Sequence, residues 1–114
     1  MPTKTSLRPP VSDIIEGVQI GIYVWLPPTD ELHWSAELVG LYGVTEAPTT
    51  EQEFAKLLHP LDRTRVEGET STFLGSDAQG YSHSFRILRP DGSERMILDR
   101  AVIQRDAAGK AQVV

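Results

Sequence analysis

Histidine is the residue type in this chain that best suits acid–base chemistry, because its side chain titrates near neutral pH. The chain has three histidines and no cysteine, so disulfides, thiolate nucleophiles and chromophores attached through sulfur are excluded. His59 lies three residues before Asp62 and could pair with it as a general base, or it could make a structural hydrogen bond where a helix begins. His33 is expected to face solvent. The three histidines lack metal-ligand spacing, so we predict no metal site and no catalytic set.

His83 is the histidine best placed to bind a ligand, because the residues around it alternate in character. One face of this segment carries Tyr81, His83, Phe85 and Ile87, and the other carries Ser82, Ser84, Arg86 and Leu88. A period of two is typical of a half-buried antiparallel strand. If the first face lines a pocket, His83 could bind a polar or anionic ligand, or haem iron. Otherwise it is a structural histidine at the edge of the strand.

Turn and capping signals predict the elements that position these residues. Pro90-Asp91-Gly92 is a tight turn, because proline presets φ and glycine accepts positive φ. Ser35, and Thr50 with Glu53, are typical of helix N-termini. The expected order is strands at residues 20–26 and 31–34, helices at 36–42, 50–58 and 62–74, strands at 79–88 and 94–104, and a last strand from residue 110.

The N-terminal region predicts a contact with a second copy of the chain. Residues 1–11 are expected to be a flexible lead-in, because the first ten are polar and include three prolines. Ser12 can cap a short helix over residues 12–19 whose apolar side carries Ile14, Ile15 and Val18. This side must be buried on the sheet or on a partner. We therefore predict a homodimer through this helix and the outer face of the sheet.

Composition and charge exclude several classes of partner. The net charge is −5 at pH 7 and the eleven Lys and Arg residues are scattered, so no nucleic-acid surface is expected. No apolar run is long enough to span a bilayer, and the N-terminus lacks the apolar core of a signal peptide. We expect a cytoplasmic domain without membrane contact, although a parent protein could carry membrane segments elsewhere.

Four segments of the chain resemble a PAS domain, of the subtype common in bacterial sensor proteins. They are Gly21-Ile22-Tyr23-Val24-Trp25, Trp34-Ser35-Ala36-Glu37-Leu38 with Leu41-Tyr42-Gly43, His59-Pro60-Leu61-Asp62-Arg63, and Phe85-Arg86 with Arg89-Pro90-Asp91-Gly92-Ser93. Leu61 and Met96 depart from the usual pattern. The resemblance implies a single α+β domain over residues 12–114. Its five-stranded antiparallel sheet has the order 2-1-5-4-3 with helices on one face, and its last strand is expected to be cut short at Val114.

The resemblance implies a sensory domain of signal transduction rather than an enzyme. Such a domain binds a small ligand or dimerises, and relays a signal to an output domain outside this chain. A sensor histidine kinase of a two-component system is the first expectation for that output. The alternative is a relay module without a ligand, attached to a diguanylate cyclase or a DNA-binding transcriptional regulator. The ligand is not identified by the sequence, and neither haem nor noncovalent flavin is expected.

The expected ligand pocket lies between the helices and the sheet. Its candidate residues are Tyr23, Trp25, Phe54, Leu57, Phe73, Tyr81, His83 and Phe85. Alternation places His83 and Phe85 on one face, and it leaves open whether Tyr23 and Trp25 point inward. A mainly apolar pocket with a polar anchor is typical of a small-ligand site, and His83 is the anchor that we predict.

Overall fold

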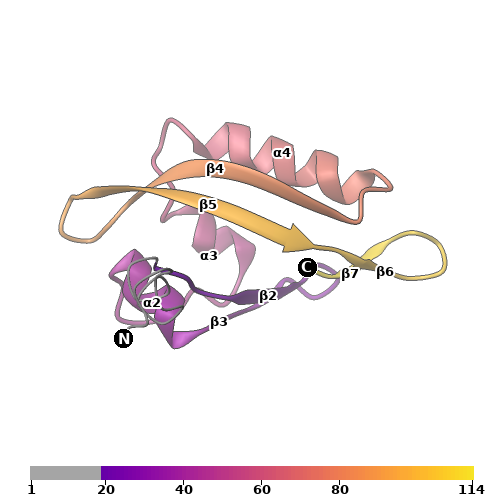
Figure 1. The fold of residues 1–114 in the computed structure, drawn as a ribbon, viewed down its shortest axis with the longest axis horizontal. Helices are drawn as coiled ribbons and strands as arrows, with labels where there is room; N and C mark the ends of the chain where they lie inside the picture. The colour runs from indigo at the N-terminus through magenta and orange to yellow at the C-terminus, as the bar shows by residue number, and fades with distance from the viewer. Residues whose placement is uncertain (1–18) are drawn as a thin grey trace, which may run out of the picture.

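The computed structural model describes residues 19–114, which form an α+β fold (Figure 1). The elements in chain order are β2 (Tyr23–Leu26), β3 (Glu31–Trp34), α2 (Ala36–Tyr42), α3 (Glu51–Ala55), α4 (Arg63–Gly75), β4 (Gly80–Leu88), β5 (Glu94–Val102), β6 (Gln104–Arg105) and β7 (Ala111–Val113). The lead-in expected at residues 1–11 lies outside the described residues. So does the helix expected at residues 12–19, except for its last residue, Gln19. Within residues 19–114, no helix has both the length and the apolar character needed to cross a membrane.

Helix α2 begins and ends where its capping residues predict. The Ser35 hydroxyl accepts a hydrogen bond from the Leu38 amide at 3.3 Å, which satisfies one of the free N–H groups of the first turn. Gly43 ends the helix at a φ of 71°, a left-handed conformation that glycine adopts at little cost. Leu38 and Tyr42 lie on the buried side of this helix.

Helix α3 begins at the predicted cap but is shorter than the predicted helix at residues 50–58. The Thr50 hydroxyl accepts a hydrogen bond from the Glu53 amide at 3.1 Å. The amides of Leu57 and Leu58 donate to carbonyls only three residues earlier, so the chain tightens into turns after Ala55. The Leu57 carbonyl then accepts from the Leu88 amide at 3.1 Å, which draws this segment towards β4.

The predicted long hairpin is confirmed. Strands β4 and β5 pair along their whole length in an antiparallel register that places His83 opposite Asp99. The Arg89 amide donates to the Ser93 carbonyl at 2.8 Å across the turn, and Gly92 has a φ of 88°. The predicted inward face is also found, since His83, Phe85 and Ile87 are 9%, 2% and 0% exposed.

The strands form three two-stranded antiparallel sheets, where the sequence predicted one sheet of five strands in the order 2-1-5-4-3. The pairs are β2 with β3, β4 with β5, and β6 with β7. Two hydrogen bonds of 2.8 and 2.9 Å between Trp25 and Val114, the residue after β7, connect the end of this strand to β2. Among the described strands, β5 pairs only with β4, so its other edge faces β2 without joining it.

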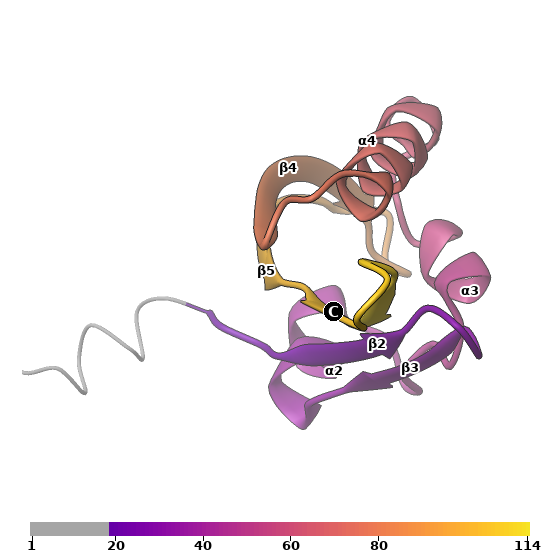
Figure 2. The same cartoon turned by 90° about the vertical axis from the view of Figure 1, so that its right-hand side faces the viewer.

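The core consists of two adjoining clusters. The first contains Leu38, Tyr42, Leu58, Val66, Phe85 and Ile87, and the second contains Trp25, Leu32, Ile103, Ala111 and Val114. Tyr23, Trp34 and Phe54 pack against both clusters and so join them. Figure 2 shows β4 and β5 arching over β2 and β3, with α3 and α4 along one side of the strands.

Candidate ligand-binding site

A cavity of about 370 Å³ lies between β2 and β5, along the two strand edges that do not pair with each other. Its aromatic lining consists of Tyr23, Trp25, Trp34, Tyr42, Phe54, Tyr81 and Phe85. Acidic side chains also line it, Glu51 from the first turn of α3 and Asp99 from β5. The volume is in the usual range for pockets that hold a small organic molecule.

The structure brings five of the eight predicted pocket residues to this cavity. Tyr23, Trp25, Phe54, Tyr81 and Phe85 line it, whereas Leu57, Phe73 and His83 do not. Leu57 packs against the first core cluster. Phe73 stacks on Tyr81 with ring centroids 4.8 Å apart and the planes nearly parallel. His83, the predicted anchor, is buried beside Asp99 rather than exposed to the cavity.

Two tyrosines and Asp99 form the polar centre of the cavity. The Tyr23 hydroxyl donates to an Asp99 carboxylate oxygen at 3.0 Å and lies 3.1 Å from the Tyr81 hydroxyl. Because Tyr23 has one hydroxyl proton and gives it to Asp99, Tyr81 must be the donor in the second bond. Burial raises the pKa of Tyr81 to about 12. Burial and then the Asp99 charge raise the pKa of Tyr23 well above its usual value, so both phenols stay protonated.

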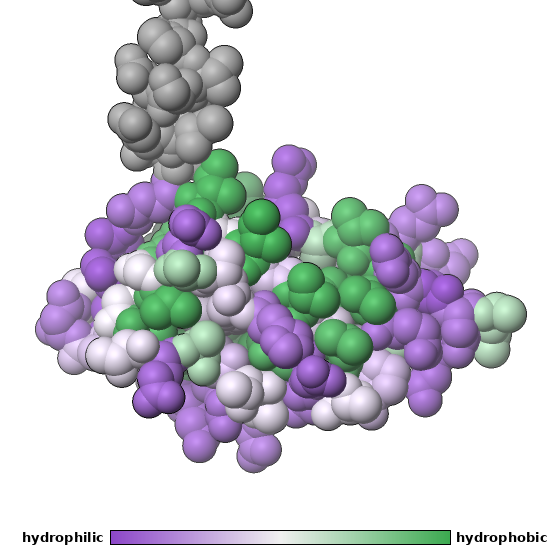
Figure 3. Space-filling model, turned by 90° about the horizontal axis from the view of Figure 1, so that it is seen from below, coloured by the Kyte–Doolittle hydropathy of each residue, from purple (hydrophilic) through white to green (hydrophobic). Residues whose placement is uncertain are grey.

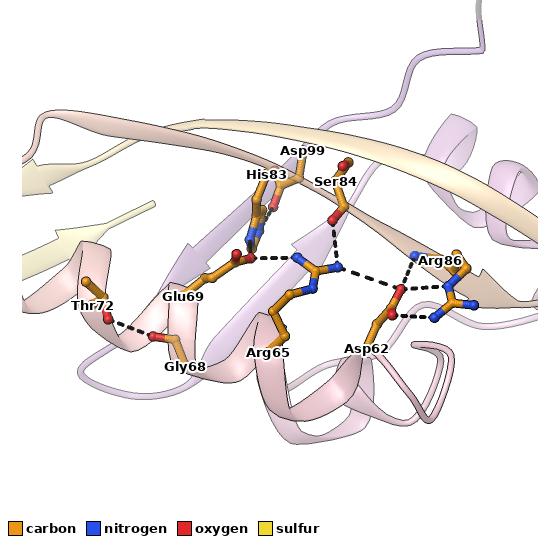
Figure 4. Close-up of polar contacts among 9 residues, drawn as sticks. All are labelled: Asp62, Arg65, Gly68, Glu69, Thr72, His83, Ser84, Arg86 and Asp99. Carbon is orange, nitrogen blue, oxygen red and sulfur yellow. Dashed lines mark hydrogen bonds and ion pairs between the residues drawn. The ribbon is translucent and has the colours of Figure 1, made fainter.

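His83 connects this polar centre to helix α4. Its Nε2 lies 3.3 Å from an Asp99 oxygen and its Nδ1 lies 3.0 Å from a Glu69 oxygen (Figure 4). A neutral imidazole has one N–H and satisfies one of these acceptors, whereas the imidazolium satisfies both. Burial works to lower the pKa of His83, but the hydrogen bonds to Asp99 and Glu69 outweigh it and raise the pKa. The protonated form therefore fits the site.

The polar chain continues from His83 along α4. Arg65 donates to the same Glu69 oxygen at 2.9 Å and to the Ser84 carbonyl at 3.0 Å (Figure 4). Asp62, at the start of α4, accepts from the Arg86 guanidinium at 2.7 and 3.1 Å and from the Arg86 amide at 2.8 Å. These bonds hold the pKa of Asp62 well below its usual range, and the contacts with the guanidinium contribute most to this shift. Helix α4 is therefore attached to β4 at both ends of this polar chain.

His59 is not arranged as a general base. Its Nδ1 accepts a hydrogen bond from the Leu61 amide at 3.1 Å, and the Asp62 carboxylate is held by Arg86. The geometry therefore supports the other interpretation of His59, a structural hydrogen bond just before α4 begins. Within residues 19–114 there is no group of three His, Cys, Asp or Glu side chains that could hold a metal ion.

Asp99 and Glu51 are the functional candidates that the sequence reasoning missed. A signal for Asp99 existed, because pairing Leu88 with Glu94 across the turn places Asp99 opposite His83, on the inward face with Ile97. Glu51 had no such signal, since its position depends on how α3 packs. Burial, followed by the nearby Asp30 charge, raises the pKa of Glu51 to about 7.

Comparison with known proteins identifies the family. A sequence model described as the PAS fold matches residues 31–114. No curated protein matches the chain closely enough to count as a relative. A solved sensory box histidine kinase/response regulator from Burkholderia thailandensis is 23% identical, with a TM-score of 0.71 over 90% of this chain and 77% of that chain.

Two further solved structures are similar to the chain. The N-terminal domain of a diguanylate cyclase with a PAS/PAC sensor from Marinobacter aquaeolei is 18% identical, with a TM-score of 0.71 over 80% of this chain and 84% of that one. The PAS domain of a GGDEF family protein from Chromobacterium violaceum is 31% identical over 83% of this chain and 94% of that one, with a TM-score of 0.47. Since the family model covers well over half of the residues, the chain belongs to the PAS fold family.

Proposed function

We propose that this PAS domain is a sensory input module whose cavity binds a small organic ligand. The observation that carries the proposal is the cavity between β2 and β5, which combines aromatic walls with the convergent polar groups of Tyr23, Tyr81 and Asp99. Ligand pockets in proteins are typically built in this way. The proposal assigns no catalytic residue to this domain.

The polar chain gives the cavity a route to α4. A ligand that contacts Tyr23 or Asp99 changes the hydrogen bonds available to His83, which shares Asp99 with Tyr23. His83 in turn holds Glu69 on α4. Ligand binding is therefore expected to shift the contacts between α4 and β4, and this shift is the signal that we propose the domain transmits.

The output domain proposed for a longer polypeptide is a sensor histidine kinase. The support is the similarity in fold to the domain of a sensory box histidine kinase/response regulator. A diguanylate cyclase is the alternative output, supported by the second structural neighbour. Both similarities are below 25% identity, so they bear on the fold, and the choice of output is part of the proposal.

A second candidate function is signal relay by dimerisation without a ligand. The observation that favours it is an exposed apolar set at β2 and β5, part of which also borders the mouth of the cavity. It consists of Ile22, Val24, Met96, Leu98 and Val102, of which four are at least 67% exposed. Apolar side chains also gather in groups on the face seen in Figure 3. Exposed apolar groups of this kind often mark interaction surfaces. The predicted homodimer through the helix at residues 12–19 and the outer face of the sheet stays a prediction.

A metabolite screen by thermal shift separates the two functions. Ala101 is a small, inward-facing residue that lines the cavity, so Ala101→Phe should fill the space. Ala107→Phe, at an exposed turn, is the matched control. The ligand-binding proposal expects compounds that stabilise the wild type and Ala107→Phe but not Ala101→Phe. If no compound does so, and Met96→Glu, at an exposed position outside the cavity lining, converts a dimer to a monomer in light scattering, the relay function is favoured instead.

A further inference from the structure

Two polar side chains at the cavity have no protein partner. The Glu51 carboxylate makes no hydrogen bond or ion pair with any residue in 19–114, although its own amide donates to Asp30 at 2.9 Å. Tyr42 is 3% exposed, and its hydroxyl likewise has no hydrogen-bond partner within this range. Among residues 19–114 the fully buried polar side-chain atom without a partner is Arg89 Nε, so the Glu51 carboxylate and the Tyr42 hydroxyl are open to the cavity that they line. Both side chains therefore have hydrogen-bonding capacity that a molecule in the cavity would satisfy.

The charges around these two groups are mainly negative. Burial, then the Asp99 and Glu51 charges, raise the pKa of Tyr42, so its hydroxyl stays neutral, and all three residues line the cavity. The charged groups that act on Glu51 are Asp30 between β2 and β3, Asp99 on β5, Glu67 on α4 and the opposing His83 on β4. Arg100 also lines the cavity, but it belongs to the exposed side of β5. An anionic ligand would therefore meet carboxylates at the inner part of the cavity.

We propose that the cavity binds an organic cation, a protonated amine on a planar apolar body, with its ammonium group on Glu51. This inference deepens the proposed ligand-binding function and rests on it. The ammonium would donate to the Glu51 carboxylate and to the Tyr42 oxygen, which are the two groups without protein partners. The aromatic walls would hold the apolar body and could add cation–π attraction.

The inference predicts a specific dependence on pH. A cation prefers the ionised form of Glu51, whose pKa is raised to about 7, so binding should tighten as the pH rises through neutrality. For a ligand that requires ionised Glu51, the affinity at pH 8 should exceed that at pH 6 by about tenfold. The pKa of His83 is also shifted, upwards, so the variant Glu51→Gln is needed to assign the effect to Glu51.

Calorimetric titration with three matched probes tests the inference. The probes are 2-phenylethylamine, the neutral 2-phenylethanol and the anionic phenylacetate, each titrated into the wild type, Glu51→Gln and Glu46→Gln. Glu46 is exposed in the loop after α2, so its variant controls for the loss of one negative charge. The amine should bind tightest to the wild type and to Glu46→Gln, and should lose at least about tenfold in affinity in Glu51→Gln. The rise of about tenfold in affinity between pH 6 and pH 8 that Glu51 causes should disappear in that variant.

The other outcomes separate this inference from the proposed function. If all three probes bind equally well, or if Glu51→Gln binds the amine as tightly as the wild type does, the cation inference is wrong and the ligand-binding function stands. If no probe binds, the cation inference is again overturned, and the metabolite screen with Ala101→Phe decides the ligand-binding function independently. Glu51→Gln should fold well, because it removes a carboxylate whose ionisation burial opposes.

Discussion

Replacing His83 by leucine should destabilise the domain far more than the loss of a surface histidine would. His83 is 9% exposed and contacts two carboxylates, Asp99 at 3.3 Å and Glu69 at 3.0 Å. A hydrogen bond to a charged group contributes about 1.5–3 kcal/mol. The Glu69 contact contributes less, because that side chain is 36% exposed and solvent screens it.

The substitution also leaves Asp99 with Tyr23 as its remaining partner, and Asp99 is 14% exposed. A buried charge that loses its partner adds to the cost. We therefore expect His83→Leu to lower the free energy of unfolding by about 2–4 kcal/mol, or the melting temperature by at least about 10 °C.

Urea denaturation of wild type, His83→Leu and the control His33→Leu checks this prediction. His33 is 63% exposed and pairs with an exposed Glu31, so its loss should cost less than about 1 kcal/mol. The pKa of His83 is raised by folding, so its stabilisation is full below about pH 6.5 and is lost as the pH rises through the folded pKa. The gap between wild type and His83→Leu should therefore narrow from pH 6 to pH 9. Equal effects of the two histidine substitutions at pH 6 would refute the reasoning.

Two further predictions concern packing and backbone conformation. Phe85→Ala, at a fully buried position, should lower the free energy of unfolding by about 3–5 kcal/mol. Ile22→Ala, at a 67% exposed position, should lower it by less than about 0.5 kcal/mol. Chemical denaturation measures both changes. Gly68→Ala on α4 meets open space and should stabilise the domain by about 0.5–1 kcal/mol. Gly92→Ala should destabilise it, because φ is 88° in the β4–β5 turn. Equal melting temperatures for the two glycine variants would contradict this.

Local rules predicted the hairpin and the helix caps. Pro90-Asp91-Gly92 formed the expected turn because the conformations of proline and glycine are limited by covalent geometry. Ser35 and Gly43 bounded α2 for similar local reasons. In such places the chain neighbours decide the structure, so the sequence is sufficient.

The parts of the site that depend on distant segments could not be predicted. The arrangement of the strands depends on long-range pairing, and the hydrogen bonds between β2 and the end of β7 join Trp25 to Val114 across most of the chain. Tyr23 and Trp25 turned out to line the cavity, which alternation alone had left open. His83 was predicted to anchor a ligand only because alternation places it on the inward face of its strand. Its contacts with Glu69 and Asp99 require knowledge of where α4 lies, and they place it behind the cavity.

The coupling of the cavity to α4 through Asp99 and His83 is tested most directly by NMR titration of the His83 ring. The Tyr23 hydroxyl donates to Asp99, which His83 also contacts, so Tyr23→Phe should leave Asp99 a stronger acceptor and raise the pKa of His83 further. Tyr42→Phe removes a hydroxyl without a partner among residues 19–114 and should leave the titration unchanged. A His83 titration that is the same in wild type, Tyr23→Phe and Tyr42→Phe would contradict the coupling.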